Sequence, residues 1–436
     1  MTSVMSRPAD DFEPVGSLDR CFAPGASASA TATCTRTLVQ REDMDELPSS
    51  FSVDDLVSAP VRGPLLSVGD QVELVDRAGE DGAGVTGSWT IAEPLGRGAT
   101  GEAWLVRRPV LGGVEEAVVK VAQCRGDAGL ENERRALEQL DHPNVIRYLG
   151  RGPDGGLALE RAYQNPLLLQ DALTPPAQRP ADRRFRPLPP AAALELAHDL
   201  LCGIAYLHSR SFAHHDIKVA NFLIVPTKPL AGPATPARLL EGVARGELRG
   251  VLIDLGGARS SSWLAGEEGT EGAHPQLTPL LAPPEVLLPR PTPVPLEERL
   301  QPSHDLYAAG LTIYMMITGH IPYDHVDPRL QLLSSLMELK GLEAAGELSP
   351  LARDRVESLE LGDARFVSSH PEARSHFTSC LWRFLRTLVG PAQTRPTAAR
   401  AYRAFCDLFR IHGGEQDQRP RQGVLAAPDG AARLAA

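Results

Sequence analysis

Four side chains between positions 216 and 254 carry the groups that phosphoryl transfer requires. Asp216, Lys218 and Asn221 follow one another at intervals of two and three residues, and Asp254 follows the apolar run 251–253. One carboxylate can orient a hydroxyl nucleophile, the ammonium group can neutralise a moving phosphoryl group, and the amide with the second carboxylate can hold Mg²⁺. The spacing therefore predicts a loop that supports phosphoryl transfer.

A lysine interrupts the apolar run 117–121, which is typical of a buried strand. A buried, unpaired ammonium group is costly, so we expect a carboxylate partner for Lys120. Glu133, in the helical segment 130–137, can supply it. A snorkelling lysine and a solvated glutamate are the ordinary alternative for such residues. The company of the other motifs favours the buried pair.

The segment 95–101 has glycines at positions 96, 98 and 101. This G-x-G-x-x-G spacing serves both dinucleotide-binding domains and protein kinases, and an ordinary glycine-rich hairpin can also carry it. In dinucleotide-binding domains the loop opens a helix. Here the residues 102–106 read as a strand that runs towards a Gly112-Gly113 turn. We therefore expect a hairpin that folds over phosphates.

The order of these motifs resembles that of the eukaryotic-type Ser/Thr protein kinases. The segment 214–221 is similar to the catalytic loop H-x-D-x-K-x-x-N, and Asp254-Leu255-Gly256 is similar to the metal-binding D-x-G. One departure stands out, because His215 occupies the position where that family usually has Arg. Lys218 two residues after Asp216, together with Thr278, matches the Ser/Thr pattern.

Three later segments extend the resemblance to about residues 89–409. The segment 278–285 is similar to the end of an activation segment, with Thr278 and Glu285 in register and two substitutions between them. Asp305 is similar to the aspartate that holds the catalytic-loop backbone. Arg395 is similar to the arginine that pairs with the glutamate at position 285.

The resemblance implies a role for each of these residues and two cofactors, ATP and Mg²⁺. It implies that Asp216 accepts the substrate proton, that Lys218 neutralises the γ-phosphate and that Thr278 hydrogen-bonds near both. Lys120, oriented by Glu133, is expected to hold the α- and β-phosphates. Asn221 and Asp254 are the implied ligands of Mg²⁺. The implied ATP-binding residues are Leu95, Gly96, Arg97, Gly98, Ala99, Thr100, Gly101, Ala103, Val118, Lys120, Leu159, Glu160 and Ala162.

The fold class implied by the resemblance is α+β, a two-lobed protein kinase fold with a small β-rich N-lobe and a larger helical C-lobe. We expect the kinase domain at residues 89–410, with the N-lobe at 89–160, the C-lobe at 161–410 and insertions at 174–190 and 226–250. Residues 65–88 read as an accessory strand or hairpin. The low-complexity ends, an acidic arm at 1–64 and a tail at 411–436, are expected to be disordered.

Charge and cysteine usage restrict the partners. Residues 1–88 hold 15 Asp and Glu against 6 Arg, a net of −9, whereas the remaining residues have a net of only −2. An acidic arm on a near-neutral body argues against nucleic acid as a partner. The six cysteines are widely spaced without a C-x-x-C pair, which favours a reducing, cytoplasmic location. The most apolar stretch, 306–318, is too short to span a bilayer.

Three function classes compete for this pattern. The first is an active Ser/Thr protein kinase that phosphorylates protein substrates, and itself by autophosphorylation. The second is a pseudokinase scaffold that binds partner proteins through the same fold. The third, a small-molecule phosphotransferase of the aminoglycoside kinase type, is not expected to carry the segment 278–285 or Arg395. Because no catalytic position is lost, we expect the active protein kinase.

Overall fold

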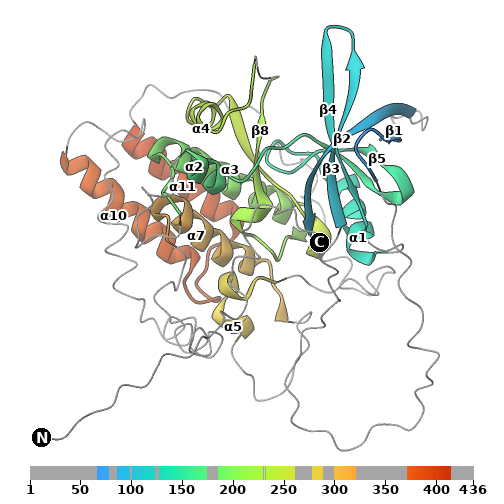
Figure 1. Ribbon diagram of the computed structural model, residues 1–436. Helices are drawn as coiled ribbons and strands as arrows, with labels where there is room; N and C mark the ends of the chain where they lie inside the picture. The colour runs from blue at the N-terminus through green and yellow to red at the C-terminus, as the bar shows by residue number, and fades with distance from the viewer. Residues whose placement is uncertain are drawn as a thin grey trace, which may run out of the picture.

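The computed structural model describes residues 66–77, 86–98, 101–122, 127–173, 185–228, 230, 232–260, 277–287, 299–320 and 371–413. The expected acidic arm, most of the tail and most of the first insertion lie outside these residues. Within them, the six strands of the main sheet gather on one side and most of the helices on the other (Figure 1). No helix in the described part of the chain is long and apolar enough to cross a membrane.

The main sheet is antiparallel and has the strand order β1-β2-β3-β4-β6-β5, with a two-residue pairing between β1 and β5. Its register places Val118 opposite Leu159 and Ala103 opposite Lys120. The strands are β1 Gln71–Asp76, β2 Thr86–Gly98, β3 Gly101–Val110, β4 Gly113–Val121, β5 Tyr148–Arg151 and β6 Leu157–Glu160.

The glycine-rich segment is a hairpin, as predicted, because β2 ends at Gly98 and β3 begins at Gly101. Gly101 has a φ of +151°, and a Cβ atom there would collide with the carbonyl oxygen of Val121. Only glycine therefore lets β3 cross so close to the end of β4. A strand after the glycines excludes the dinucleotide-binding alternative, in which a helix would follow.

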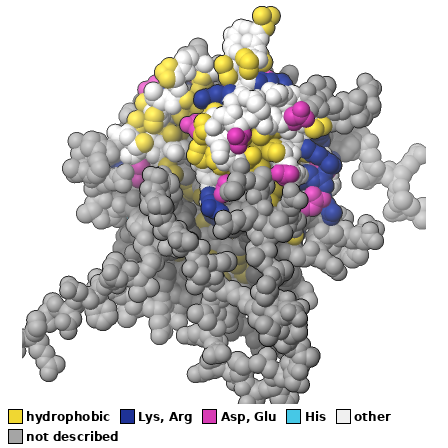
Figure 2. Space-filling model, turned by 45° about the vertical axis from the view of Figure 1, so that its right-hand side comes forward, with side chains coloured by type: hydrophobic (Ala, Val, Ile, Leu, Met, Phe, Trp, Pro, Cys, Tyr) yellow, Lys and Arg dark blue, Asp and Glu magenta, His cyan; other side chains and the backbone are white. Residues whose placement is uncertain are grey.

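Strands β3 and β4 continue beyond the rest of the sheet as a projecting hairpin (Figure 1). Two ion pairs cross it, Arg107 with Glu116 at 2.8 Å and Arg108 with Glu115 at 2.7 Å. Its tip carries exposed apolar side chains, Leu111 being fully exposed. Figure 2 shows hydrophobic atoms at the end of this projection.

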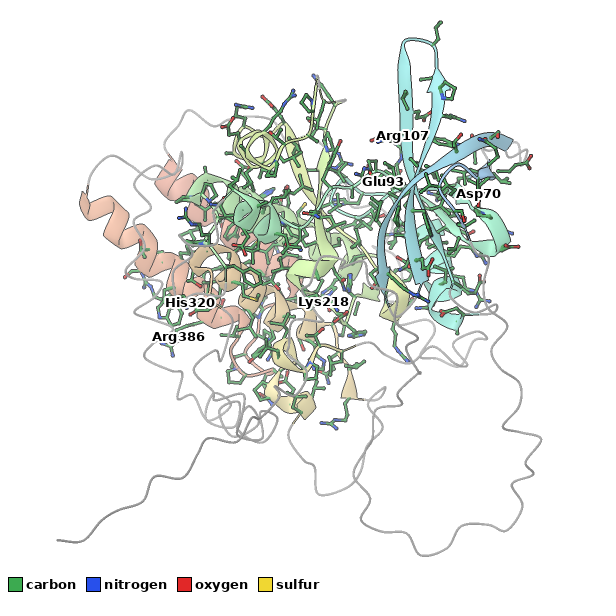
Figure 3. The ribbon with its side chains drawn as sticks, viewed as in Figure 1. Asp70, Glu93, Arg107, Lys218, His320 and Arg386 are labelled. Atoms are coloured by element: carbon green, nitrogen blue, oxygen red, sulfur yellow. The ribbon has the colours of Figure 1, made fainter. Side chains whose placement is uncertain are left out.

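The helical side is built around α3 and α7, which pack on each other and on the short strands that follow α3. Helix α7 is buried along nearly its whole length. Figure 3 places Lys218 on this side, whereas Asp70, Glu93 and Arg107 lie on the sheet. The elements are α1 Ala128–Glu138, α2 Pro166–Ala172, α3 Pro190–Ser209, β7 Phe212–Ala213, β8 Phe222–Pro226, α4 Pro236–Ala244, β9 Leu248–Leu252, β10 Arg259–Ser260, α5 Pro284–Leu287, α7 Ser303–Thr318, α10 Pro371–Leu388 and α11 Ala398–Gly413.

The second expected insertion contains helix α4, which lies between the paired strands β8 and β9. Thr235 caps its N-terminus by accepting a hydrogen bond from the amide of Arg238 at 3.4 Å. Leu239, Leu240 and Val243 are buried on one face of the helix. The face packs on α2 and α3, so this part of the insertion is built into the helical core.

Strand β1 belongs to the segment expected as an accessory strand or hairpin, and the structure gives it two partners, β2 and β5. Val72 and Leu74 point into a small apolar cluster with Trp89 and Ile91. The intervening side chains face outwards, as the strand period requires. Strand β1 is therefore part of the core of the sheet.

This packing predicts that Leu74→Ala destabilises the protein by about 2–4 kcal/mol, because truncation removes buried surface and leaves a cavity. Denaturant unfolding of the full chain measures the change. Val75→Ala is the matched control, since Val75 is 40% exposed on the same strand and its truncation should cost less than about 0.5 kcal/mol. Equal losses in the two variants would contradict the assignment of β1 to the core.

Candidate active site

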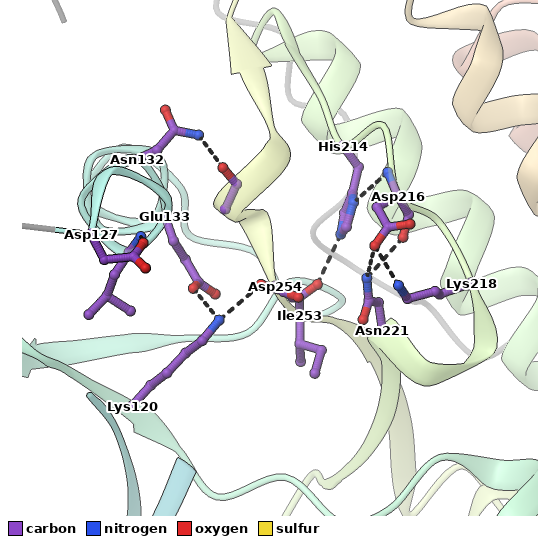
Figure 4. A network of polar contacts seen from close by, with 12 residues as sticks. Lys120, Asp127, Asn132, Glu133, His214, Asp216, Lys218, Asn221, Ile253 and Asp254 are labelled. Carbon is purple, nitrogen blue, oxygen red and sulfur yellow. Dashed lines mark hydrogen bonds and ion pairs between the residues drawn. The ribbon is translucent and has the colours of Figure 1, made fainter. Parts of the chain in front are cut away.

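The four residues predicted to support phosphoryl transfer lie on two adjacent loops. Asp216, Lys218 and Asn221 lie between β7 and β8, and Asp254 follows β9. Strands β8 and β9 are antiparallel, and the first residue of β8, Phe222, lies opposite the last residue of β9, Leu252. Both loops therefore lie at the same end of this strand pair. The backbone amide of Ile253 donates to the carbonyl of Asn221 at 3.0 Å, which joins them directly. Asn221 and Asp254, which are 33 residues apart in the sequence, thus lie in one site (Figure 4).

Asp216 is the centre of a dense polar network and is buried. Lys218 Nζ donates to its Oδ2 at 2.6 Å, and the hydroxyl of Thr278 donates to its Oδ1 at 2.8 Å. Lys218 Nζ also lies 3.3 Å from that hydroxyl oxygen. The three residues that the sequence analysis grouped, Asp216, Lys218 and Thr278, are therefore together, although Thr278 lies 62 residues further along the chain.

Lys120 is the second centre, and it has two carboxylate partners. Its Nζ lies 2.6 Å from Glu133 Oε2, as predicted, and 2.9 Å from Asp254 Oδ1 (Figure 4). Burial alone would lower the pKa of Lys120, but the two carboxylates outweigh it and hold that pKa above its ordinary value. Lys120 also keeps the pKa of Asp254 low against the opposing effect of burial. Complete burial instead raises the pKa of Glu133, although the charge of Lys120 opposes this effect. The ammonium group and the Asp254 carboxylate are therefore the pair whose charges stabilise each other.

The arrangement of oxygen donors fits Mg²⁺. Asn221 donates both to the carbonyl and to Oδ2 of Asp216, each at 3.0 Å, so its amide nitrogen is committed and its amide oxygen faces elsewhere. Asp254 Oδ1 lies 2.9 Å from Lys120 Nζ, and the pKa of this carboxyl is held below its ordinary value, so Asp254 can supply a carboxylate oxygen. A hard divalent cation prefers such amide and carboxylate oxygens. Asn221 and Asp254 are therefore chemically suited to hold it.

Asp305 fixes the backbone of the catalytic loop from α7. Its two carboxylate oxygens accept the amide hydrogens of His214 and His215, both at 2.8 Å. His208 Nε2 also lies 2.9 Å from Oδ2. Burial would raise the pKa of Asp305, but these partners, His208 first, hold it below its ordinary value. His215 itself has a φ of +65°, an uncommon conformation that this support can stabilise.

The flanking histidines have different surroundings. His214 is fully buried, and its Nε2 lies 3.0 Å from the carbonyl oxygen of Ile253, so it packs between the two loops. His215 is also buried, but its Nδ1 has no hydrogen-bond partner among the described residues. Burial lowers the pKa of His215, which leaves the imidazole neutral at pH 7.

Glu285 and Arg395 meet as predicted. Arg395 Nη1 donates to Glu285 Oε1 at 2.8 Å and to the carbonyl of Ser303 at 3.0 Å. The guanidinium side chain is fully buried and also binds the carbonyl of Gly390 at 2.8 Å through Nη2. A buried arginine with this set of acceptors ties α5 to α7 and to the segment before α11.

The predicted nucleotide-binding residues differ in their surroundings. Leu95, Gly96 and Arg97 are exposed along β2, and Gly98 and Gly101 close the hairpin. The side chains of Ala103, Val118, Leu159 and Ala162 belong to the main apolar cluster. The side chain of Glu160 instead pairs with Arg249 at 3.0 Å. Ala99 and Thr100 lie outside the described residues.

Asn132 is a positioning residue that the sequence analysis missed. It is buried in α1 beside Glu133, and its amide donates to the carbonyls of Gly256 and Ala258 at 2.8 and 2.9 Å. These bonds attach α1 to the segment after Asp254. A polar residue inside a helix was the available signal, but its partners are backbone carbonyls more than 120 residues away, which no side-chain pattern marks.

Comparison with known proteins identifies the class of this fold and site. The sequence model of the protein kinase domain matches residues 89–383, about two thirds of the chain. The chain is 30% identical over 251 residues to the serine/threonine-protein kinase pkn2 of Myxococcus xanthus, covering 56% of this chain and 26% of that protein. It is 29% identical over 255 residues to the serine/threonine-protein kinase PkaA of Streptomyces coelicolor, covering 55% and 40%.

A third relative is the serine/threonine-protein kinase PknF of Mycobacterium tuberculosis, 27% identical over 272 residues, which cover 60% of this chain and 50% of PknF. The matched region thus spans a quarter to a half of these relatives. The matches agree with one another in class. The chain belongs to the eukaryotic-type Ser/Thr protein kinase family.

The position of Asp305 predicts a large effect for an isosteric change. In Asp305→Asn one oxygen becomes an amide group that faces a backbone N–H donor, and a charged hydrogen-bond acceptor is lost. We expect a loss of about 2–4 kcal/mol in the free energy of unfolding at pH 7. Because the folded-state pKa is depressed, the wild-type advantage exists above the unfolded pKa and disappears as the pH falls through the folded one.

Denaturant unfolding at pH 7 and at lower pH values measures this difference. Asp171→Asn, on α2 and away from the catalytic loop, is a control for the general effect of neutralising a buried aspartate. If the stability of Asp305→Asn equalled that of the wild type at pH 7, the carboxylate would not be the support of the loop.

Proposed function

We propose that the protein transfers the γ-phosphate of ATP to Ser or Thr hydroxyl groups of protein substrates in a Mg²⁺-dependent reaction. The observation that carries this proposal is that Lys218 and Thr278 both donate hydrogen bonds to the Asp216 carboxylate. The buried carboxylate therefore lies beside an ammonium group. An incoming hydroxyl requires the carboxylate, and a phosphoryl group requires the cation. We take the strand-rich part, residues 89–160, as the N-lobe and residues 161–410 as the C-lobe.

Asp216 has the role of orienting the substrate hydroxyl and accepting its proton late in transfer. Lys218 lies within hydrogen-bond distance of this carboxylate and neutralises charge on the phosphoryl group. Thr278 contacts both residues and belongs to the segment that ends at Glu285. Its two contacts therefore depend on the position of that segment relative to the catalytic loop. These roles are assigned from the contacts together with the chemistry of phosphoryl transfer.

Lys120 binds the α- and β-phosphates in this proposal, and Glu133 orients it. Asn221 and Asp254 hold Mg²⁺, which when bound neutralises phosphate charge and aligns the nucleotide. The glycine hairpin at 95–101 covers the phosphates, and Ala103, Val118, Leu159 and Ala162 offer an apolar surface to the adenine. The backbone at Glu160 to Ala162 is left for hydrogen bonds to the base.

The cellular context is proposed on sequence grounds. We propose a cytoplasmic location, because the six cysteines are widely spaced without a C-x-x-C pair, and protein partners, including a second copy of the kinase as a substrate of autophosphorylation. The acidic arm at residues 1–64 is proposed to be a regulatory tether, with no role in folding. Nucleic acid is not among the proposed partners, because the net charge is −11.

The proposed function makes two predictions, the first of which concerns Asp216→Asn. It should lower the rate of phosphoryl transfer by a factor of about 10²–10⁴, because the general base is lost, and leave nucleotide affinity largely intact. A radiolabelled-ATP assay on generic protein substrates and a nucleotide titration measure both properties in the same variant. Lys120→Met is the contrasting variant, since it should weaken nucleotide binding.

The wild-type protein in the same assay separates the kinase from the pseudokinase. A pseudokinase scaffold would bind partners and show no transfer above the Asp216→Asn background. Loss of nucleotide binding together with transfer in a folded Asp216→Asn variant would contradict the role given to this aspartate.

The second prediction is that activity does not depend on phosphorylation of the activation segment. His215 stands where an arginine could pair with a phosphorylated residue. A neutral imidazole lacks both the charge and the planar fork of a guanidinium group. Enzyme dephosphorylated to completion, as judged by mass spectrometry, should therefore keep most of its rate, and Ser260→Ala should have little effect.

A hundredfold drop on dephosphorylation would contradict this prediction and would direct attention to Arg259. Its charge acts on His215, and β10, on which it lies, pairs with β7 just before the catalytic loop. Arg259→Gln on the phosphorylated enzyme would then show whether that guanidinium replaces the missing arginine.

A further inference from the structure

Arg249, in β9, joins three segments behind the connection that leaves β6. Its Nη2 donates to Glu160 Oε2 at 3.0 Å and lies 3.4 Å from Oε1. Its Nη1 donates to the carbonyl of Pro226 at 3.1 Å, and its Nε donates to the carbonyl of Pro143. All three nitrogen atoms of the guanidinium group are thus used. One side chain connects the end of β6, the turn after α1 and the end of β8.

Glu160 is held from its other side as well. Its Oε1 accepts the amide hydrogen of Arg147 at 3.0 Å, and its own amide donates to the carbonyl of Arg147 at 3.0 Å. Three residues later, the amide of Tyr163 donates to the carbonyl of Ile224 at 2.8 Å. The connection from the sheet to the helical side is therefore fixed at two points, and Arg249 supplies the side-chain contact at the first.

Burial makes this ion pair stronger than an ordinary surface pair. The side chains of Arg249 and Glu160 are 21% and 16% exposed, whereas those of Arg245 and Glu247 on the same hairpin are 53% and 57% exposed. Charged groups that are partly desolvated contribute more than exposed pairs do. Two ion pairs of the same type, one shielded and one solvated, thus lie a few residues apart.

We propose that Arg249 is a positioning residue for ATP: through Glu160 it sets the position of the backbone that receives the adenine. This inference rests on the proposed function, which places the adenine against residues 159–162. Glu160, at the end of β6, pairs with Ala117 of β4, three residues before Lys120. A displacement at Glu160 therefore moves the adenine edge of the site relative to Lys120.

The chemical step should be little affected. Lys120 is held by Glu133 and Asp254, and Asp216 by Lys218, Thr278 and Asn221, none of which contacts Arg249. Loss of the guanidinium group should therefore raise the KM for ATP and leave kcat nearly unchanged. This split separates positioning of the nucleotide from a general loss of structure, which would lower kcat.

The experiment compares Arg249→Gln, Glu160→Gln, the double variant and the matched control Arg245→Gln in the full chain. We expect Arg249→Gln to raise the KM for ATP and the Kd of a non-hydrolysable ATP analogue about five- to tenfold, with kcat within about twofold. Glu160→Gln should behave similarly, and the double variant should be no worse than the weaker-binding single variant, because both remove one interaction. Arg245→Gln should leave KM and kcat unchanged.

Three results would overturn the inference: an unchanged KM in Arg249→Gln, additive effects in the double variant, or a rise in kcat, which would make the pair a restraint. If Arg249→Gln does not fold, Glu160→Gln decides alone, since it leaves the bonds of Arg249 to Pro143 and Pro226 in place. Failure of the proposed function is distinguishable, because the wild type would then transfer no phosphate. The Kd values would still report on Arg249.

Discussion

The site depends on one largely buried ammonium group and on the two carboxyl groups that lie beside it. Lys120 comes from the sheet, Glu133 from α1 and Asp254 from the segment after β9, so their contacts bring three separate elements together. Leaving any of these charges buried without its partner would cost several kcal/mol. The electrostatic requirement of one lysine thus constrains where α1 and the loop after β9 can lie.

The surrounding contacts stabilise this arrangement without taking part in it. Asn132 attaches α1 to the chain after Asp254, and Asp305 supports the backbone at His214 and His215 from α7. Arg395 binds the Glu285 carboxylate together with the carbonyls of Ser303 and Gly390. In each case a buried polar side chain accepts from or donates to backbone groups of a loop. Loops that carry function have few apolar contacts of their own, so such bonds define their conformation.

The two ion pairs of Arg249 and Arg245 illustrate why position decides the value of a charge. Arg245 follows α4 directly and Arg249 lies in β9, and each has a glutamate partner. Only Arg249 is shielded and bound to backbone carbonyls on either side. The insertion between β8 and β9 therefore ends in a residue that reaches back to the sheet. The segment expected as the second insertion, 226–250, thus contributes to the connection between the sheet and the helices.

The sequence by itself determined the elements and partners that depend on residue type. The resemblance to protein kinases implied the pairing of Glu285 with Arg395, which the structure shows. From residue type alone, the glycines at 96, 98 and 101 followed by a β-like run predicted a hairpin, and a lysine in an apolar strand predicted a carboxylate partner. These predictions succeeded because burying a charge or bringing two backbones together leaves few permitted residues.

Only the tertiary structure decided the contacts that run to backbone atoms or between unmarked residues. The carbonyl partners of Asn132, the second carboxylate on Lys120, the place of β1 beside both β2 and β5, and the link from Arg249 to Glu160 leave no periodic or motif signal. Every residue offers the same carbonyl oxygen, so the sequence does not show which one is used. Chain packing selects it, by bringing distant segments within hydrogen-bond distance of a side chain that must be satisfied.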